Sequence, residues 1–175
     1  MSIRPIKMTS QAQPTMEGAG VHLHRVFGFG DTDPFDPFPM MDDFRNDNPQ
    51  EYLKGFPWHP HRGIETITYV LKGNVEHSDS LGNTGVLSDG DVQWMTAGSG
   101  IIHQEMPTGN ADGQMHGFQL WANLPREQKM CTPRYQDVAS EHITSLTDDD
   151  GTHIRVIAGD YRGYRGPVDG IDTDP

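Results

Sequence analysis

The sequence has 175 residues, enough for one domain with a sizeable core, and a formal net charge of −12. Such an acidic chain lacks the basic patches that bind nucleic acid or an anionic membrane, so neither is expected as a direct partner. The single cysteine, Cys131, excludes an intramolecular disulfide, and no apolar stretch has the length of a spanning helix. These features predict a cytoplasmic protein.

The chain begins with a polar segment, residues 1–20, which we expect to form an N-terminal arm. Residues 21–27 then alternate between apolar and polar side chains, as in a strand with one polar face. They include His22 and His24, but no carboxylate or further histidine follows at a useful spacing. This pair is therefore not expected to bind metal.

Residues 31–39 contain three prolines, which cannot donate to a sheet ladder, and are predicted to form a loop. Residues 40–44 fit a short strand. The acids of this region lack the glycine turn and terminal glutamate of an EF-hand calcium loop. We therefore predict a solvated acidic segment rather than a calcium site. The acids are Asp33, Asp36, Asp42 and Asp43.

Many short strands are predicted in the rest of the chain. Residues 65–72 are rich in β-branched and aromatic side chains, as strands are. Further strands are expected at 75–80, 92–96, 115–124 and 153–159. The 20 glycines and 13 prolines of the chain agree with many turns, such as the hairpin turn at 81–85. Short strands with almost no helix predict an all-β fold, a double-stranded β-helix (jelly-roll barrel).

Two pairs of candidate metal ligands lie within this strand-rich region. His59 and His61 form one pair, and His103 and Glu105 form the other. Side chains two apart on an extended chain point to the same side, so each pair shares a face. If the two strands are neighbours, three imidazoles and one carboxylate meet at one divalent metal, and coordination positions stay open.

The donor set does not choose a metal. Nitrogen and oxygen ligands without a thiolate suit Fe(II), Mn(II), Ni(II), Cu(II) or Zn(II). Cys131 lies outside both pairs, so we do not expect a thiolate ligand. His77 and His116 fall on predicted strands nearby, where each either orients a ligand or is an ordinary strand histidine.

A second glutamate, Glu65, is an alternative carboxylate. On an unbroken strand it would share a face with His59 and His61. Pro60 and Gly63 predict a bend or bulge between them, which takes Glu65 out of phase.

Several runs of the sequence resemble the pirin family of the cupin superfamily. The three central runs are HPHRGIETITY at 59–69, HSDSLGN at 77–83 and DVQWMTAGSGIIHQEM at 91–106. The flanking segments 36–42 and 117–125 are similar to pirin segments as well. The resemblance covers about residues 20 to 168.

The resemblance implies a cupin barrel over residues 21–168 that holds one iron, with Fe(II) favoured over Mn, Ni, Cu or Zn. The implied ligands are His59, His61, His103 and Glu105. In many other cupins the carboxylate ligand comes four residues after the second histidine, which here is Glu65. In the pirin pattern it comes two residues after the last histidine, which favours Glu105.

Pirins usually carry two cupin halves. The tail at residues 169–175 lies about where a second half would begin, so the sequence resembles the metal-binding half alone. If the other half normally covers a sheet edge, this chain is expected to form a homodimer through that edge.

The resemblance also implies two kinds of function. The first is a dioxygenase that cleaves a flavonol such as quercetin, with Glu105 as the group that accepts the substrate proton. Arg62, next to the first histidine pair, either attracts an anionic substrate or forms a surface salt bridge. Trp94, Met95, Phe118 and Trp121 either wall an apolar pocket for a small aromatic substrate or belong to the core.

The second is a non-catalytic iron-binding regulator that acts through a protein partner. The acidic surface suits a basic partner better than it suits DNA. A metal-dependent sugar-phosphate isomerase, as in other cupins, is disfavoured because the acidic sequence shows no cationic phosphate site.

Overall fold

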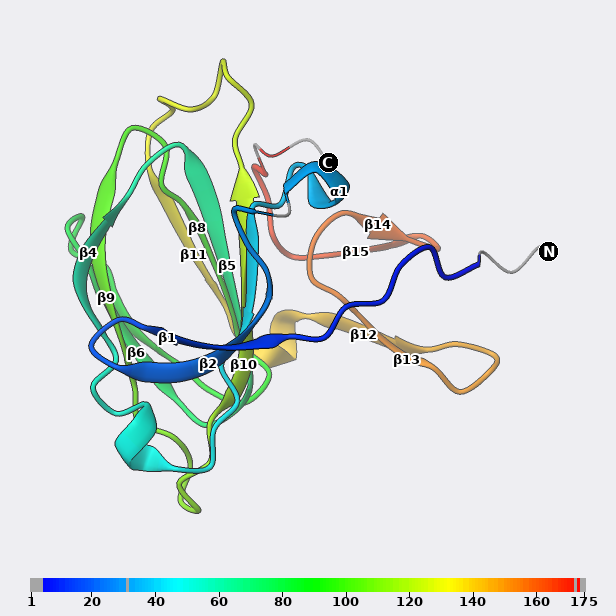
Figure 1. The fold of residues 1–175 in the computed structure, drawn as a ribbon. Coiled ribbons are helices and arrows are strands. Elements are labelled where there is room, and N and C mark those ends of the chain that lie inside the picture. The colour runs from blue at the N-terminus through cyan, green and yellow to red at the C-terminus, as the bar shows by residue number, and fades with distance from the viewer. Residues whose placement is uncertain (1–4, 31, 172, 174–175) are drawn as a thin grey trace.

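The computed structural model describes residues 5–30, 32–171 and 173, and most of its strands form two antiparallel sheets around a common core (Figure 1). The larger sheet has the strand order β1, β2, β3, β10, β5, β8, β11. Its strands are β1 (Gln13–Glu17), β2 (Val21–Phe27), β3 (Met40–Asp43), β10 (His116–Asn123), β5 (Ile64–Lys72), β8 (Val92–Thr96) and β11 (Arg134–Val138). The smaller sheet has the order β4 (Phe56–His61), β9 (Ile101–Pro107), β6 (Val75–Asp79) and β7 (Thr84–Leu87).

Short elements lie outside these sheets. Two hairpins project to one side of the barrel in Figure 1: β12 (Thr144–Thr147) with β13 (His153–Val156), and β14 (Asp160–Tyr161) with β15 (Tyr164–Arg165). The helical turns are α1 (Thr32–Phe35), η1 (Pro49–Glu51) and η2 (Ser140–His142). In the part of the chain described, no helix has the length and apolar character needed to cross a membrane.

The predicted all-β jelly roll is confirmed. The strand expected at 65–72 is β5, and those expected at 21–27 and 115–124 are β2 and β10. The polar N-terminal segment contributes β1, which pairs with β2 at the edge of the large sheet. The loop predicted at 31–39 contains the short helix α1 instead. Pro34 is tolerated there because the first turn of a helix has no intrahelical partner for its N–H groups.

Apolar side chains gather at both ends of the barrel and polar ones in its middle. One apolar cluster comprises Val21, Tyr52, Val70, Val75, Leu87 and Met115, and another comprises Met95, Ala97 and Ile101. The inward side chains of β9 show the same gradient, with Ile101 and Pro107 at the ends and His103 and Glu105 between them. Burial of the two ends therefore stabilises a polar middle layer.

The chain passes from the small sheet to the large sheet at Gly63. β4 ends at His61 and β5 begins at Ile64. Gly63 has a φ of +69°, and its N–H donates to the carbonyl of Gly98 at 2.8 Å. A residue with a Cβ atom loses about 1–2 kcal/mol in this left-handed conformation. The bend that Pro60 and Gly63 predicted is therefore a change of sheet.

We predict that Gly63→Ala lowers the free energy of unfolding by about 1–2 kcal/mol, because alanine must adopt the left-handed conformation. The added Cβ meets only ordinary contacts, the nearest at 3.6 Å, so conformation rather than crowding sets the loss. Urea denaturation measures it. Gly30→Ala is the matched control, since its Cβ would meet no atom within 4 Å and its φ is not left-handed. Equal losses in the two variants would contradict the strain at Gly63.

Candidate metal centre

Three histidine side chains from β4 and β9 meet in the middle of the barrel. The two strands are antiparallel neighbours, the condition for the two ligand pairs to meet, and His59 lies directly opposite His103. His61 lies two residues further along β4 and points to the same side as His59. β4 can carry Pro57 and Pro60 because it is the edge strand of its sheet.

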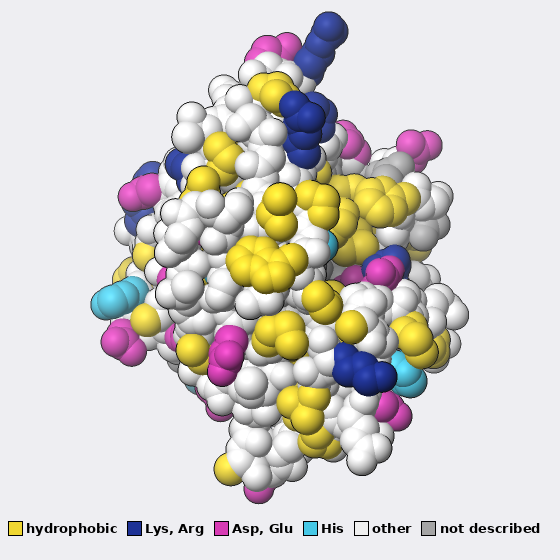
Figure 2. All heavy atoms as spheres, turned by 90° about the vertical axis from the view of Figure 1, so that its left-hand side faces the viewer, with side chains coloured by type: hydrophobic (Ala, Val, Ile, Leu, Met, Phe, Trp, Pro, Cys, Tyr) yellow, Lys and Arg dark blue, Asp and Glu magenta, His cyan; other side chains and the backbone are white. Residues whose placement is uncertain are grey.

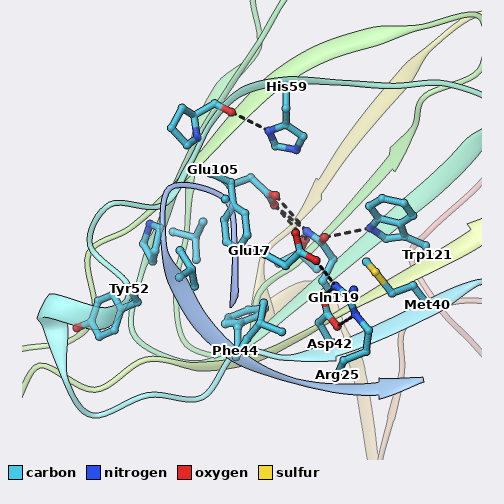
Figure 3. A pocket seen from close by; sticks show the side chains of 18 of the residues that line it. Glu17, Arg25, Met40, Asp42, Phe44, Tyr52, His59, Glu105, Gln119 and Trp121 are labelled. Carbon is cyan, nitrogen blue, oxygen red and sulfur yellow. Dashed lines mark hydrogen bonds and ion pairs between the residues drawn. The ribbon is translucent and has the colours of Figure 1, made fainter. Parts of the chain in front are cut away.

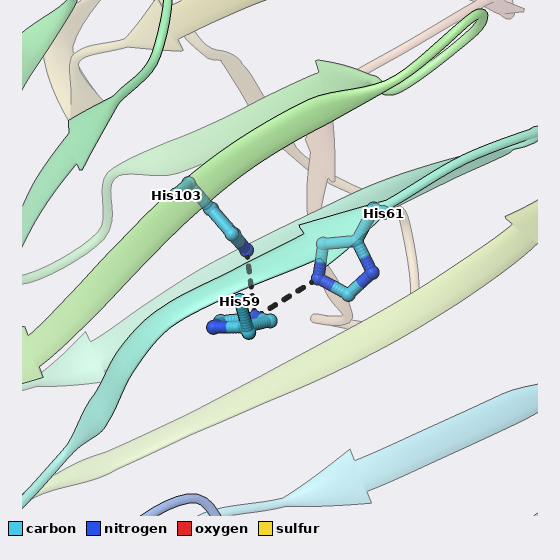
Figure 4. Close-up of side chains that lie close together, drawn as sticks. All are labelled: His59, His61 and His103. Atoms are coloured by element: carbon cyan, nitrogen blue, oxygen red, sulfur yellow. Dashed lines mark hydrogen bonds between the residues drawn. The ribbon is translucent and has the colours of Figure 1, made fainter.

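The ring nitrogens of these histidines converge (Figure 4). The Nε2 atom of His59 lies 3.0 Å from that of His61 and 2.9 Å from that of His103. One nitrogen from each ring lies within 4.8 Å of the others. His103 is fully buried and His61 is 8% exposed, so water competes little for these nitrogens.

Burial keeps two of these rings neutral at physiological pH. Burial, assisted by the neighbouring histidines His103 and His59, lowers the pKa of His61 to about 3. Burial, assisted by His59 and His77, also lowers the pKa of His103 to about 3. His59 donates its Nδ1–H to the Pro57 carbonyl at 2.8 Å, and its Nε2 atom is the ring nitrogen that faces the other two rings. Neutral imidazoles arranged in this way fit a divalent transition metal.

Glu105 approaches the three histidines from β9 but is held at the rim of the cluster. Its Oε2 atom lies 3.9 Å from the Nε2 atom of His103. Gln119 Nε2 donates to both carboxylate oxygens, at 3.2 Å to Oε1 and 3.1 Å to Oε2, and Thr68 Oγ1 donates to Oε1 at 3.3 Å (Figure 3). The structure therefore forms a close group of three histidines with a hydrogen-bonded carboxylate beside it.

Glu65 lies on the other face of its sheet. It stands opposite Thr96 in the pairing of β5 with β8, whereas Thr68, three residues along β5, faces the cavity. The carboxylate of Glu65 is fully buried and accepts hydrogen bonds from Thr96 Oγ1 at 2.7 Å and from the Thr173 N–H at 3.3 Å. The change of sheet at Gly63 thus directs Glu65 away from the histidines.

Of the two further strand histidines, His77 lies beside the cluster and His116 does not. The ring centroid of His77 is 5.3 Å from that of His103, and the ring stacks on Tyr135 at 4.6 Å. Tyr135 in turn donates to Asp137 at 2.8 Å, and burial raises the pKa of both side chains. His116 lines a separate polar pocket beside β2 and β3.

A cavity of about 490 Å³ opens beside the histidines (Figure 3). His59, His61 and Glu105 lie in its polar wall. Its apolar wall includes Leu23, Phe29, Met40, Phe44, Phe56 and Trp121. This volume and this mixture of apolar surface with a few converging polar groups are typical of small-molecule sites.

An ion pair in the cavity wall corrects the prediction of a solvated acidic segment. Arg25 binds Asp42 through two hydrogen bonds of 2.8 Å, and it also contacts Glu17 at 2.9 Å. Asp42 is 4% exposed and Asp43 is 8% exposed, so the prediction is wrong for these two acids. They lie on β3, where Asp42 faces Arg25 across the strand pair, and this partner is too distant in sequence to be anticipated.

Of the four residues that either wall an apolar pocket or belong to the core, Trp121 lines the cavity and the other three do not. Trp94 lies opposite Ile67 in the β5–β8 pairing and packs with it on the outer face of the large sheet. Met95 is buried in the apolar cluster at one end of the barrel. Phe118 and Trp121 are three residues apart on β10, so strand alternation puts them on opposite faces.

Two other polar residues differ in how the sequence indicates their role: it suggested one for Arg62 and none for Gln119. Arg62 is exposed and donates to the sulfur of Met130 at 3.5 Å, and it does not line the cavity. Gln119 alternates with its neighbours on the predicted strand, which places it on the face of Trp121. Nothing local marks its contact with Glu105, because that residue comes from the other sheet.

We predict that the free energy of unfolding of the metal-free chain falls as pH is lowered from about 6.5 towards 3. The buried His61 and His103 stay neutral in the folded state, whereas they take up protons in the unfolded state once pH drops below the usual histidine pKa. Stability from this source is complete above pH of about 6.5. Urea denaturation at several pH values, with EDTA present, measures the slope.

A His61→Gln/His103→Gln double variant should have a flatter profile over this range, because it lacks the two groups. His24→Gln, which changes an exposed histidine on β2, is the control and should keep the wild-type slope. A double variant as steep as wild type would contradict the assignment.

Comparison with known proteins identifies the relatives of this chain. Residues 20–122 match the family model described as Pirin. A "Pirin-like protein" of Caulobacter vibrioides is 47% identical over 175 residues, which cover 99% of this chain and 63% of that protein. The chain spans less than two thirds of the length of the curated relatives it matches.

Two solved structures are also similar. Quercetin 2,3-dioxygenase from Acinetobacter baumannii has a TM-score of 0.79 and 34% identity, and the match covers 90% of this chain and 57% of that one. The bacterial pirin YhhW from Escherichia coli, in complex with nickel(II), has a TM-score of 0.56 and 32% identity, covering 70% and 52%. Fold and relatives together define a cupin. Within that superfamily, the chain belongs to the pirin family.

Proposed function

We propose that this chain is the metal-binding cupin unit of a dioxygenase that cleaves a flavonol such as quercetin. The observation that carries the proposal is the group of three histidines with Glu105 beside it, open to a cavity of about 490 Å³ with an apolar wall. The similarity to a structure named quercetin 2,3-dioxygenase supports the choice of substrate class.

His59, His61 and His103 would hold the metal, with Glu105 as the carboxylate ligand. We propose Fe(II), and the same donors also suit Mn, Ni, Cu or Zn. The nickel(II) complex of the related YhhW supports a first-row divalent ion at a pirin site. When bound, such an ion supplies Lewis acidity towards a substrate oxygen and, for iron, redox chemistry towards dioxygen.

Glu105 would accept the proton of a substrate hydroxyl. It lines the cavity, its Oε2 atom faces His103, and hydrogen bonds from Gln119 and Thr68 hold the carboxylate in place. Trp121 lies in the cavity wall with its ring centroid 5.0 Å from that of His61. A planar aromatic substrate that stacked on this indole would lie next to the histidines.

A non-catalytic iron-binding regulator that acts through a protein partner is the second candidate. Trp58 and Ile102, on the neighbouring strands β4 and β9, are 54% and 48% exposed. Figure 2 views the side of the barrel where these strands lie, and hydrophobic side chains are spread over it. Exposed aromatic and aliphatic side chains suit a protein contact, including one with a second copy of this chain. This candidate does not use the cavity, so the enzyme ranks first.

We predict that the purified chain binds one Ni(II) or one Fe(II), the latter under anaerobic conditions, and that His59→Ala, His61→Ala and His103→Ala each weaken binding more than about 100-fold. Each substitution removes one of the three converging nitrogens. Isothermal titration calorimetry measures the affinity and the stoichiometry.

A His22→Ala/His24→Ala variant is the matched control, because it removes the other His-x-His pair of the chain. It should bind metal like wild type. Wild-type affinity in the three single variants would rule out the site.

We predict that the Fe(II)-loaded chain consumes dioxygen when given quercetin. Glu105→Ala should reduce this uptake by at least about 100-fold, the range expected for loss of a general base, and His59→Ala should do so because it removes a metal ligand. An oxygen electrode measures the uptake under matched iron concentrations.

Flavonols oxidise slowly without a protein, and unbound iron accelerates this oxidation. The His59→Ala protein therefore serves as the control for iron outside the site. Equal uptake by wild type and His59→Ala would refute the flavonol dioxygenase and would favour the regulator that acts through a protein partner.

A further inference from the structure

We infer that Gln119 is a positioning residue, held in one orientation by a hydrogen bond from Trp121. Its own hydrogen bonds to Glu105 orient one carboxylate oxygen towards the histidines and the other away from them. This inference deepens the proposed function and rests on it for the metal.

The orientation of the Gln119 amide is set by its two neighbours. The indole nitrogen of Trp121 can only donate, and it lies 3.1 Å from Gln119 Oε1. An ionised carboxylate can only accept, and both oxygens of Glu105 lie within 3.2 Å of Gln119 Nε2. A flipped amide would place donor against donor and acceptor against acceptor, so this chain of contacts permits one amide orientation (Figure 3).

The two oxygens of Glu105 are consequently unlike. Oε1 accepts from Thr68 Oγ1 at 3.3 Å and from Gln119 Nε2 at 3.2 Å. Among the described residues, Oε2 accepts from Gln119 alone, at 3.1 Å, and it is the oxygen near His103 Nε2, at 3.9 Å. Oε1 is therefore held by two hydrogen bonds. Oε2 accepts only one and is the oxygen that could also coordinate a cation.

Trp121 connects this arrangement to the cavity. It is partly exposed in the cavity wall, and its ring meets the His61 ring edge-on at 5.0 Å and 83°. A small molecule in the cavity that contacts the indole would therefore lie close to His61, and it would contact the first member of the hydrogen-bond chain from Trp121 through Gln119 to Glu105. Gln119 acts on the cation only through Glu105, which separates it from a residue that merely supports the fold.

The first test uses the metal-free protein. In ¹H–¹⁵N spectra the Trp121 indole signal, assigned by its loss in Trp121→Phe, should be downfield and slow to exchange. Gln119→Leu should move it upfield and speed its exchange. Glu105→Gln should shift it in the wild-type background and leave it unchanged in the Gln119→Leu background. An indole signal that is unchanged in both Gln119→Leu and Glu105→Gln would overturn the inference.

The second test measures Ni(II) affinity by calorimetry. Gln119→Leu should weaken binding about 10-fold, and Trp121→Phe by a smaller factor, as is typical when a group that orients a ligand is lost. In a Glu105→Gln background, Gln119→Leu should change affinity less than about two-fold. The same roughly 10-fold loss in both backgrounds would show that Gln119 does not act through Glu105, and would overturn the inference.

Gln104→Leu is the matched control, because Gln104 adjoins Glu105 on β9 and is not among the residues lining the cavity. It should keep wild-type affinity and the wild-type indole signal. A wild-type chain that failed to bind Ni(II) at all would count against the proposed metal site, while the indole signal would still decide the role of Gln119.

Discussion

The structure depends on holding three imidazoles close together, two of them buried, in the middle of a β-barrel. His59 and His103 stand opposite each other on antiparallel strands, and His61 joins them from the next inward position. Burial lowers the pKa of His61 and His103, which removes the protons that would repel each other and a cation. The apolar clusters at the two ends of the barrel provide the burial energy that a polar middle layer lacks.

The surroundings of this layer differ for the two glutamates, Glu65 and Glu105, that the sequence offers as carboxylate ligands. Both are buried, but Glu105 faces the cavity from β9 of the small sheet, whereas Glu65 lies on the face of the large sheet that points away from the cavity. Thr96 and Thr173 engage Glu65, whereas Gln119 and Thr68 engage Glu105 beside the histidines. One carboxylate thus belongs to the packing of the C-terminal segment, and the other faces the cavity.

Much of the site could be predicted because strand geometry has a period of two. That period alone places His59 with His61, and His103 with Glu105, and it puts Gln119 beside Trp121. Residue type, used without knowledge of the sheet order, left Trp94 undecided between pocket and core, and it misplaced Asp42, which was expected in solvent. Their faces are set by partners, Ile67 and Arg25, that lie far away in the sequence.

The sequence by itself determined the fold class, the two same-face pairs of candidate ligands and the pirin resemblance, because these depend on local alternation, turn residues and short motifs. Only the tertiary structure decided that β4 and β9 are neighbours, that the turn at Gly63 changes sheets, and that a cavity opens at the histidines. Those features arise from hydrogen bonds and packing between segments distant in the chain. No local pattern of residues encodes such pairings directly, since each is selected by the free energy of the whole barrel.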